Sequence, residues 1–263
     1  MAQKDMVEKT LEAYNDVFAD IVNVLLFNGE ELVKEDELEQ ITLNSIYKAD
    51  GKLREQERDT AKMWQKIQDN EQNTVNICIA TFGVENQTEP ENDMPLRTIG
   101  YDGASYRGQL YYVTDENGKR RMNTNPRYPV ITLVLYFGYK KHWDKSKSLI
   151  NSLSNVPDKL KPYINDYKLN LFEIAYLTDE QVNMFKSDFR IVADYFVQMR
   201  KNSNYKPSKQ QFQHVKEVLQ MMSVLTNDRR FEEICNSSEE RREPANMCEF
   251  LDDAINKGRI EGR

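Results

Sequence analysis

The first part of the chain places apolar residues with the period of an amphipathic helix. They recur every three or four positions, at Val7, Leu11, Tyr14, Phe18, Ile21 and Leu25. Such a stripe forms the buried face of a helix, and Asn28-Gly29 then provides a natural helix stop. Residues 30–74 are strongly charged. Because apolar positions fall near one face and no Gly or Pro intervenes, we expect a second helix over Leu53–Ile67.

Three later segments have the composition of buried strands. Thr74–Gln87 (TVNICIATFGVENQ) carries apolar residues on both alternating faces, as an interior strand does. Tyr128–Tyr139 is β-branched and aromatic, and Lys168–Leu177 (KLNLFEIAYL) has the same character. Between the first two, Met94–Tyr112 predicts a helix with Asp93 as its N-cap and a proline in its first turn.

After Thr178 the pattern is helical to the end of the chain. The predicted helices are Asp179–Phe185, Ser187–Lys201, Ser208–Leu225, Arg229–Cys235 and Met247–Lys257. We therefore expect an α/β fold, with a mixed sheet flanked by helices over residues 1–177. An all-helical C-terminal region, residues 178–263, packs on that core or follows it.

Composition narrows the class of protein. Hydrophobic residues make up 39% of the 263 positions, which is enough to bury a core. The three cysteines have no paired spacing, which argues against a disulfide framework and a thiolate zinc site. His142 and His214 lie far apart, so no histidine zinc site is expected. Neither a signal-peptide pattern nor a membrane-length apolar run occurs, so we predict a cytoplasmic protein without membrane contact.

Charge is distributed unevenly along the chain. A net charge of −7 argues against a protein that coats nucleic acid. Even so, Lys and Arg dominate between residues 186 and 216, and Lys140, Lys141, Lys145 and Lys147 surround His142 and Trp143. These basic stretches are either directed anion sites or solvated helix faces.

The candidate chemistry lies at the end of the first predicted strand, in Glu85-Asn86-Gln87. Strand side chains alternate, so Glu85 and Gln87 point the same way. A carboxylate and an amide on one face can bind a hard cation and hold an attacking water. Asp59, upstream, would complete a magnesium site. The alternative is an ordinary strand edge that meets solvent.

Several longer segments carry a resemblance to a known family. They are DVFADIVNVLLF (Asp16–Phe27), YKADGKLREQERD (Tyr47–Asp59), FGVENQTEPENDMPLRTIGYDGASYR (Phe82–Arg107), YPVITLVLYFGYKKHW (Tyr128–Trp143), Asn165–Asn202 and the NMCEFLDDAINKGRIEGR tail. Together they resemble the Rpn (YhgA-like) family of recombination-promoting nucleases and transposase-like proteins, a branch of the PD-(D/E)XK nuclease superfamily. The resemblance implies a restriction-endonuclease-like core and Mg²⁺-dependent cleavage of DNA phosphodiesters.

The resemblance also implies roles for particular residues. Glu85 and Gln87 match the family's Glu-x-Gln, a variant of (D/E)xK in which Gln replaces the superfamily's Lys. Asp59 matches the upstream Asp, and Arg97 and Tyr101 match the Arg and Tyr of the following helix. Asp59 and Glu85 would then hold Mg²⁺, or Mn²⁺ in its place, while Gln87 positions a water. Arg97 either neutralises a phosphate or pairs with a neighbouring carboxylate.

Two assignments remain open at this level. Asp50 competes with Asp59 as the upstream metal ligand, because the residues around Asp59 have a helical pattern. Asp16 and Asp20 lie close together on the first helix, and Glu12 belongs to the same group. Either an acid of this group reaches the metal, or the group forms a solvated edge.

The sequence thus predicts a Mg²⁺-dependent DNA endonuclease linked to recombination or mobile elements. We expect Arg97, Lys201, Lys206 and Lys209 to contact DNA. Two alternatives are a catalytically degenerate nuclease-fold protein that binds or regulates, and an RNase that uses the same carboxylates. A homodimer would suit double-strand cutting, which usually needs two active sites.

Overall fold

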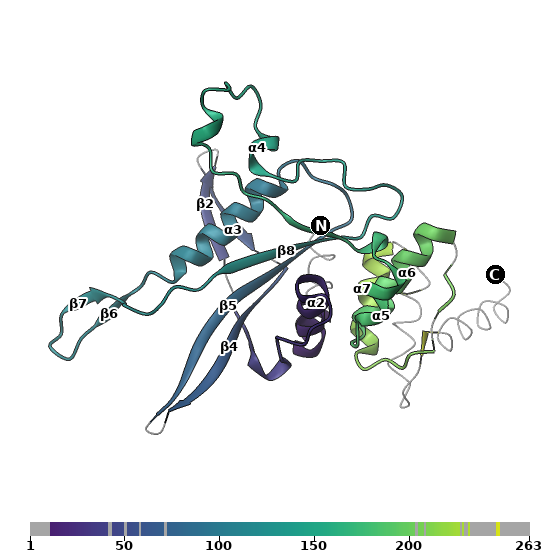
Figure 1. The fold of residues 1–263 in the computed structure, drawn as a ribbon, viewed down its shortest axis with the longest axis horizontal. Helices are drawn as coiled ribbons and strands as arrows, with labels where there is room; N and C mark the ends of the chain where they lie inside the picture. The colour runs from purple at the N-terminus through teal and green to yellow at the C-terminus, as the bar shows by residue number, and fades with distance from the viewer. Residues whose placement is uncertain are drawn as a thin grey trace.

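A computed structural model gives the fold (Figure 1). It describes residues 11–41, 44–49, 52–57, 59–70, 73–202, 205–207 and 209–226, and the single residues 228, 231, 246 and 247. The predicted helices Arg229–Cys235 and Met247–Lys257 fall almost entirely outside these residues, as does Asp50. Among the described helices, none is long and apolar enough to cross a membrane.

A five-stranded mixed sheet forms the centre of the fold. Its strands, in spatial order, are β1 (Leu38–Gln40), β4 (Thr60–Asn70), β5 (Asn73–Gln87), β8 (Val130–Tyr136) and β9 (Asn170–Glu173). The first three pair antiparallel, whereas β5, β8 and β9 run parallel. Two hairpins stand apart from the sheet, β2 (Asn44–Ala49) with β3 (Lys52–Glu57) and β6 (Tyr112–Thr114) with β7 (Arg120–Met122).

Within the described residues, the helices are α2 (Asn15–Phe27), α3 (Met94–Gly108), α4 (Leu149–Ser152), α5 (Asp179–Met184), α6 (Phe189–Asn202) and α7 (Val215–Thr226). Short 3₁₀ turns cover Glu35–Glu37, Lys161–Tyr163 and Ile174–Tyr176. The predicted α/β class and the helical C-terminal region are confirmed at this coarse level. Asn28, in the left-handed conformation with φ of 53°, ends α2 where the sequence predicted a stop.

The prediction of a helix over Leu53–Ile67 is wrong. This segment forms β3 and most of β4, and β4 pairs along its whole length with β5. Ala61, Trp64 and Ile67 have the spacing of a helix face, but pairing with two neighbouring strands overrides this local pattern. As a consequence, Asp59 lies immediately before a strand and not inside a helix.

Smaller differences occur at the ends of predicted elements. The predicted strand Lys168–Leu177 is only four residues long, because a 3₁₀ turn begins at Ile174. The last described helix starts at Val215 and not at Ser208. Strands β5 and β8 and helix α3 lie within one or a few residues of their predicted bounds, and Asp93 is the N-cap of α3.

The two faces of the sheet are covered differently. On one face, Phe82, Val84, Leu133, Leu135 and Phe137 join α2, α5, α6 and α7 in one large hydrophobic cluster. That cluster continues across residue 177 into the C-terminal helices, where the Phe137 ring lies 5.2 Å from that of Phe196. On the other face, a small cluster of Met94, Val134, Tyr136 and Trp143 packs beneath α3.

Candidate functional site at the end of strand β5

Glu85 is a buried carboxylate near the end of β5. Its side chain is 1% exposed, and in the parallel pair with β8 it is aligned with Val134. Val134 belongs to the small cluster beneath α3, so Glu85 faces α3 and not the large apolar cluster. One Glu85 oxygen forms an ion pair with Arg97 and lies 3.5 Å from the Tyr101 hydroxyl.

Arg97 and Tyr101 come from the first half of α3. They are four residues apart, so they lie on one face of the helix. Arg97 also donates to Glu91 at 2.8 Å and to the Tyr101 hydroxyl at 3.2 Å. Burial by itself would lower the pKa of Arg97, but the charge of Glu85 and the contacts with Tyr101 and Glu91 raise it above its usual value. Arg97 is therefore a permanent cation beside Glu85.

Asp59 reaches the same strand end from the neighbouring strand. The antiparallel register pairs Thr60 with Val84, which sets Asp59 beside the last residues of β5. Its carboxylate accepts the backbone N–H of Asn86 at 2.6 Å. The structure thus brings Asp59 and Glu85 to one end of two paired strands. Asp50, the rival ligand, lies outside the described residues.

Gln87 is the last residue of β5. It lies two positions after Glu85 and therefore on the same face of the strand. Its backbone carbonyl accepts the N–H of Phe137 at 2.8 Å, and its side chain is half-buried. The alternation that sequence analysis used for Glu85 and Gln87 thus holds to the end of the strand.

Asn86 is a site residue that the sequence analysis missed. It is buried and points to the face opposite Glu85, where its amide donates to Glu12 at 3.1 Å. Glu12 is itself buried and precedes α2. Asn86 therefore contacts Asp59 through its backbone and Glu12 through its side chain. The sequence did contain a signal for Asn86, because it is a polar residue between Glu85 and Gln87 on a strand predicted to be buried on both faces.

Lys62 is a second missed residue. It is fully buried on β4, aligned with Phe82, and so it lies on the α2 face of the sheet. Its ammonium donates to the Ala13 carbonyl and the Asn15 side chain, each at 2.5 Å. Burial lowers the pKa of Lys62 to about 8, although nearby Asp16 and Glu12 favour its charged form. Lys62 lies on the face of the sheet opposite Glu85. It therefore cannot take the place of the superfamily's lysine, where this chain has Gln87.

The first-helix acids separate into two groups. Asp20 accepts the backbone N–H groups of Lys186 and Ser187, at 2.9 and 2.7 Å. Asp16 contacts His214 at 3.0 Å, and the His214 ring stacks on Tyr14 at 3.7 Å. Asp16 and Asp20 therefore hold the C-terminal helices against α2. Glu12 is the acid of this group that contacts the end of β5.

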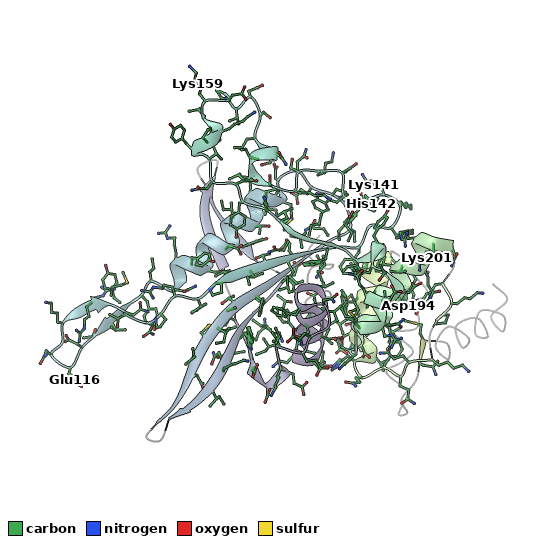
Figure 2. The ribbon with its side chains drawn as sticks, in the orientation of Figure 1. Glu116, Lys141, His142, Lys159, Asp194 and Lys201 are labelled. Atoms are coloured by element: carbon green, nitrogen blue, oxygen red, sulfur yellow. The ribbon has the colours of Figure 1, made fainter. Side chains whose placement is uncertain are left out.

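The predicted DNA-binding lysines lie on the C-terminal helices and the segment between them. Lys201 forms an ion pair with Asp179 at 2.5 Å. Figure 2 labels Lys201, close to Asp194. Lys206 is exposed, and its backbone N–H donates to Gln198 at 2.8 Å. Lys209 lines an open cavity of about 630 Å³ together with Lys186 and Arg190. The basic stretch is thus partly neutralised by pairing.

The second basic cluster, around His142, packs against aromatic and acidic groups. The His142 ring stacks on Tyr176 at 3.7 Å and lies 3.3 Å from Glu173, while Lys141 pairs with Asp144. Glu173 also accepts the backbone N–H of Trp143 at 2.5 Å. These contacts give His142 a structural role at the end of β9.

The carboxylates near the end of β5 decide whether a divalent cation could bind there. In the part of the chain that the structure describes, no three Asp, Glu, His or Cys side chains are grouped as metal ligands. Mg²⁺, however, is commonly held by one or two carboxylates, with waters and substrate phosphates as further ligands. Asp59 and Glu85 fit that pattern, provided that Arg97 yields its place on Glu85. In the present arrangement Arg97 neutralises the carboxylate that a cation would otherwise neutralise.

Comparison with protein-family models, with curated proteins and with solved structures gave no significant match for this chain.

Proposed function

We propose that the chain is a magnesium-dependent endonuclease that hydrolyses phosphodiester bonds of DNA, with a restriction-endonuclease-like core. The observation that carries this proposal is the meeting of two carboxylates, Glu85 and Asp59, at the end of paired strands β4 and β5. A mixed sheet with helices on both faces is compatible with that core. The link to recombination or mobile elements rests on the family resemblance alone.

Each residue has a definite part in the proposed reaction. A bound Mg²⁺ would polarise the scissile phosphate and lower the pKa of an attacking water. Asp59 and Glu85 supply carboxylate oxygens for the cation, and Gln87, on the same face as Glu85, orients the water. Arg97 exchanges its ion pair with Glu85 for a contact with a DNA phosphate, and Tyr101 holds the guanidinium by its hydroxyl.

Asn86 and Glu12 act indirectly in this scheme. The Asn86 N–H fixes one oxygen of Asp59, and its amide is fixed by the buried Glu12 carboxylate. Both contacts restrain the end of β5, because Asn86 stands between Glu85 and Gln87. They are therefore positioning residues.

The Arg97–Glu85 ion pair favours one rival function. If Arg97 stays on Glu85 permanently, the chain is a nuclease-fold protein that binds or regulates without cutting. An RNase that uses the same carboxylates is the other alternative, and a substrate panel separates it from the DNA endonuclease.

The test is cleavage of supercoiled plasmid DNA with Mg²⁺, Mn²⁺ or EDTA. We compare the wild type with Glu85→Gln and, as a matched control, with Glu180→Gln on the exposed surface of α5. We expect metal-dependent nicking that falls by at least about a hundredfold in Glu85→Gln and persists in Glu180→Gln. Cleavage of RNA and not of DNA would favour the RNase. No cleavage of either substrate with either metal would favour the binding protein.

A further inference from the structure

The β6–β7 hairpin projects from the body of the molecule as a two-stranded arm (Figure 1). All six of its strand residues are exposed. Glu116 marks its tip in Figure 2. An isolated two-stranded hairpin is marginally stable in water, and this arm buries none of its strand side chains. Its form is therefore not explained by packing.

The base of the arm is held by a polar network. Arg127 donates to the Gln109 carbonyl at 2.6 Å and to the Asn123 side chain at 2.8 Å. Asn123 donates to Gln109 as well, and Gln109 exchanges hydrogen bonds with the backbone of Tyr128. Gln109 and Asn123 are buried. These bonds fix the direction of the arm relative to α3 and β8.

The surface of the arm is basic and aromatic. Lys119, Arg120 and Arg121 are consecutive, and the Arg120 guanidinium lies 4.7 Å from the centre of the exposed Tyr112 ring. Of the two acids at the turn, Asp115 accepts the backbone N–H of Lys119 at 2.9 Å and pairs with Arg121. With three cations and two acids the arm has a net charge of about +1, on a chain whose net charge is −7.

We propose that the β6–β7 arm enters the major groove of duplex DNA. This inference rests on the proposed function and adds the surface that grips the substrate. A major groove about 12 Å wide accepts a two-stranded β-ribbon, and Lys and Arg supply contacts to phosphates on its walls. The deep, narrow major groove of duplex RNA does not accept side chains in this way.

The distance between the arm and the site around Glu85 suits one DNA duplex that contacts both. Arg97 lies in the first turn of α3, and Gly108 ends the helix near the base of the arm. The two residues are about 16 Å apart along the helix axis. At 3.4 Å per base pair this is about five base pairs. A duplex lying along α3 would therefore present one phosphate to Arg97 and a groove to the arm.

The test is binding of a short DNA duplex in EDTA, without cleavage. The arm variant is Arg120→Glu with Arg121→Glu. The matched control is Lys159→Glu with Lys161→Glu, two exposed lysines on a different projection; Figure 2 labels Lys159 there. We expect the arm variant to bind at least about tenfold more weakly and to lower the slope of log affinity against log salt by about two. The control should stay within about twofold of the wild type.

The outcomes distinguish this proposal from the endonuclease proposal, because binding is measured without metal. Wild-type affinity and salt slope in the arm variant, with an unchanged circular dichroism spectrum, would overturn the arm. So would equal loss in arm and control variants, or tighter binding of duplex RNA than of DNA. A change in self-association in place of DNA affinity would assign the arm to a second copy of the chain. A DNA-binding arm in a chain that does not cleave would retain this inference and remove the endonuclease.

Discussion

The two faces of the central sheet are formed by the same strands but bury different kinds of side chain. The face toward α2 and the C-terminal helices buries a large apolar cluster in which Phe18, Phe137 and Phe196 are almost fully covered. The face toward α3 buries a small apolar cluster together with charged and polar groups, among them Glu85 and Asp102. Asp102 accepts hydrogen bonds from Thr132 and Tyr167.

The difference shows where this fold gains stability and where it can do chemistry. Burial of apolar side chains stabilises a fold without regard to direction, whereas a buried carboxylate needs specific partners. Alternation along β5 produces both faces at once, since Val84 and Asn86 point one way and Glu85 and Gln87 the other. Changes on the first face should therefore alter stability most, and changes on the second should alter the balance of charges.

The largest effect is expected from Phe196→Ala on the α2 side. The Phe196 ring contacts Phe137, Tyr139 and Tyr195, and its truncation leaves a cavity in the main cluster. We expect the free energy of unfolding to fall by about 3–5 kcal/mol. Urea denaturation followed by circular dichroism measures it. A loss below about 1 kcal/mol would mean that this cluster does not carry the stability of the fold.

On the α3 side, Arg97→Met tests the charge pair. The substitution leaves Glu85 buried beside Tyr101 without its cation, and we expect a loss of about 3 kcal/mol. The double variant Arg97→Met with Glu85→Met removes both charges and should recover most of that loss, because a buried pair is seldom better than apolar groups of similar size. The same denaturation measurement applies. The two residues would not be coupled if the loss of stability in the double variant equalled the summed losses of Arg97→Met and Glu85→Met alone.

Lys62 is a charged residue within the apolar side, and its effect depends on pH. Its pKa is lowered from 10.5 to about 8 in the folded chain. Between these values the unfolded chain binds more protons than the folded one, so the contribution of Lys62 to stability rises with pH. The slope is at most about 1.4 kcal/mol per pH unit. Below pH 8 the cost of burying the charge is fully present.

Unfolding of the wild type, Lys62→Met and the exposed control Lys66→Met between pH 8 and 10.5 isolates this effect. Groups shared by all three proteins, such as Cys78, whose pKa burial raises to about 11, cancel in the differences. As pH rises, the free energy of unfolding of the wild type should increase relative to that of Lys62→Met. Lys66→Met should show the same pH dependence as the wild type. Parallel profiles for all three would show that the Lys62 charge is solvated.

Much of the fold could be predicted because β8 and the second half of β5, from Ala80 onward, are covered on both faces. Their sequences therefore have the character of interior strands, and the alternation in β5 placed Glu85 and Gln87 on one face. β4 could not be recognised, because Ala61, Trp64 and Ile67 also suit a helix. Its strand form comes from pairing with β1 and β5, which no pattern within β4 itself reveals.

The contacts of the site were less predictable for the same physical reason. The Asn86–Glu12 and Lys62–Ala13 contacts join residues 74 and 49 positions apart, and no local pattern fixes such pairs. Asp16 and Asp20 have the spacing of a surface pair, yet they anchor the helices that follow residue 186. For Arg97 the sequence left open a phosphate contact or a pairing with a neighbouring carboxylate, and the folded chain pairs it with Glu85.

The central claim is that Glu85 and Asp59 together hold a divalent cation at the end of β5. Mn²⁺ binding, followed by electron paramagnetic resonance without DNA, tests it most directly. Wild type and Glu180→Gln should bind Mn²⁺ alike, whereas Glu85→Gln and Asp59→Asn should each weaken binding by at least about tenfold. Equal Mn²⁺ affinity in all four proteins, or no binding by the wild type, would contradict the account.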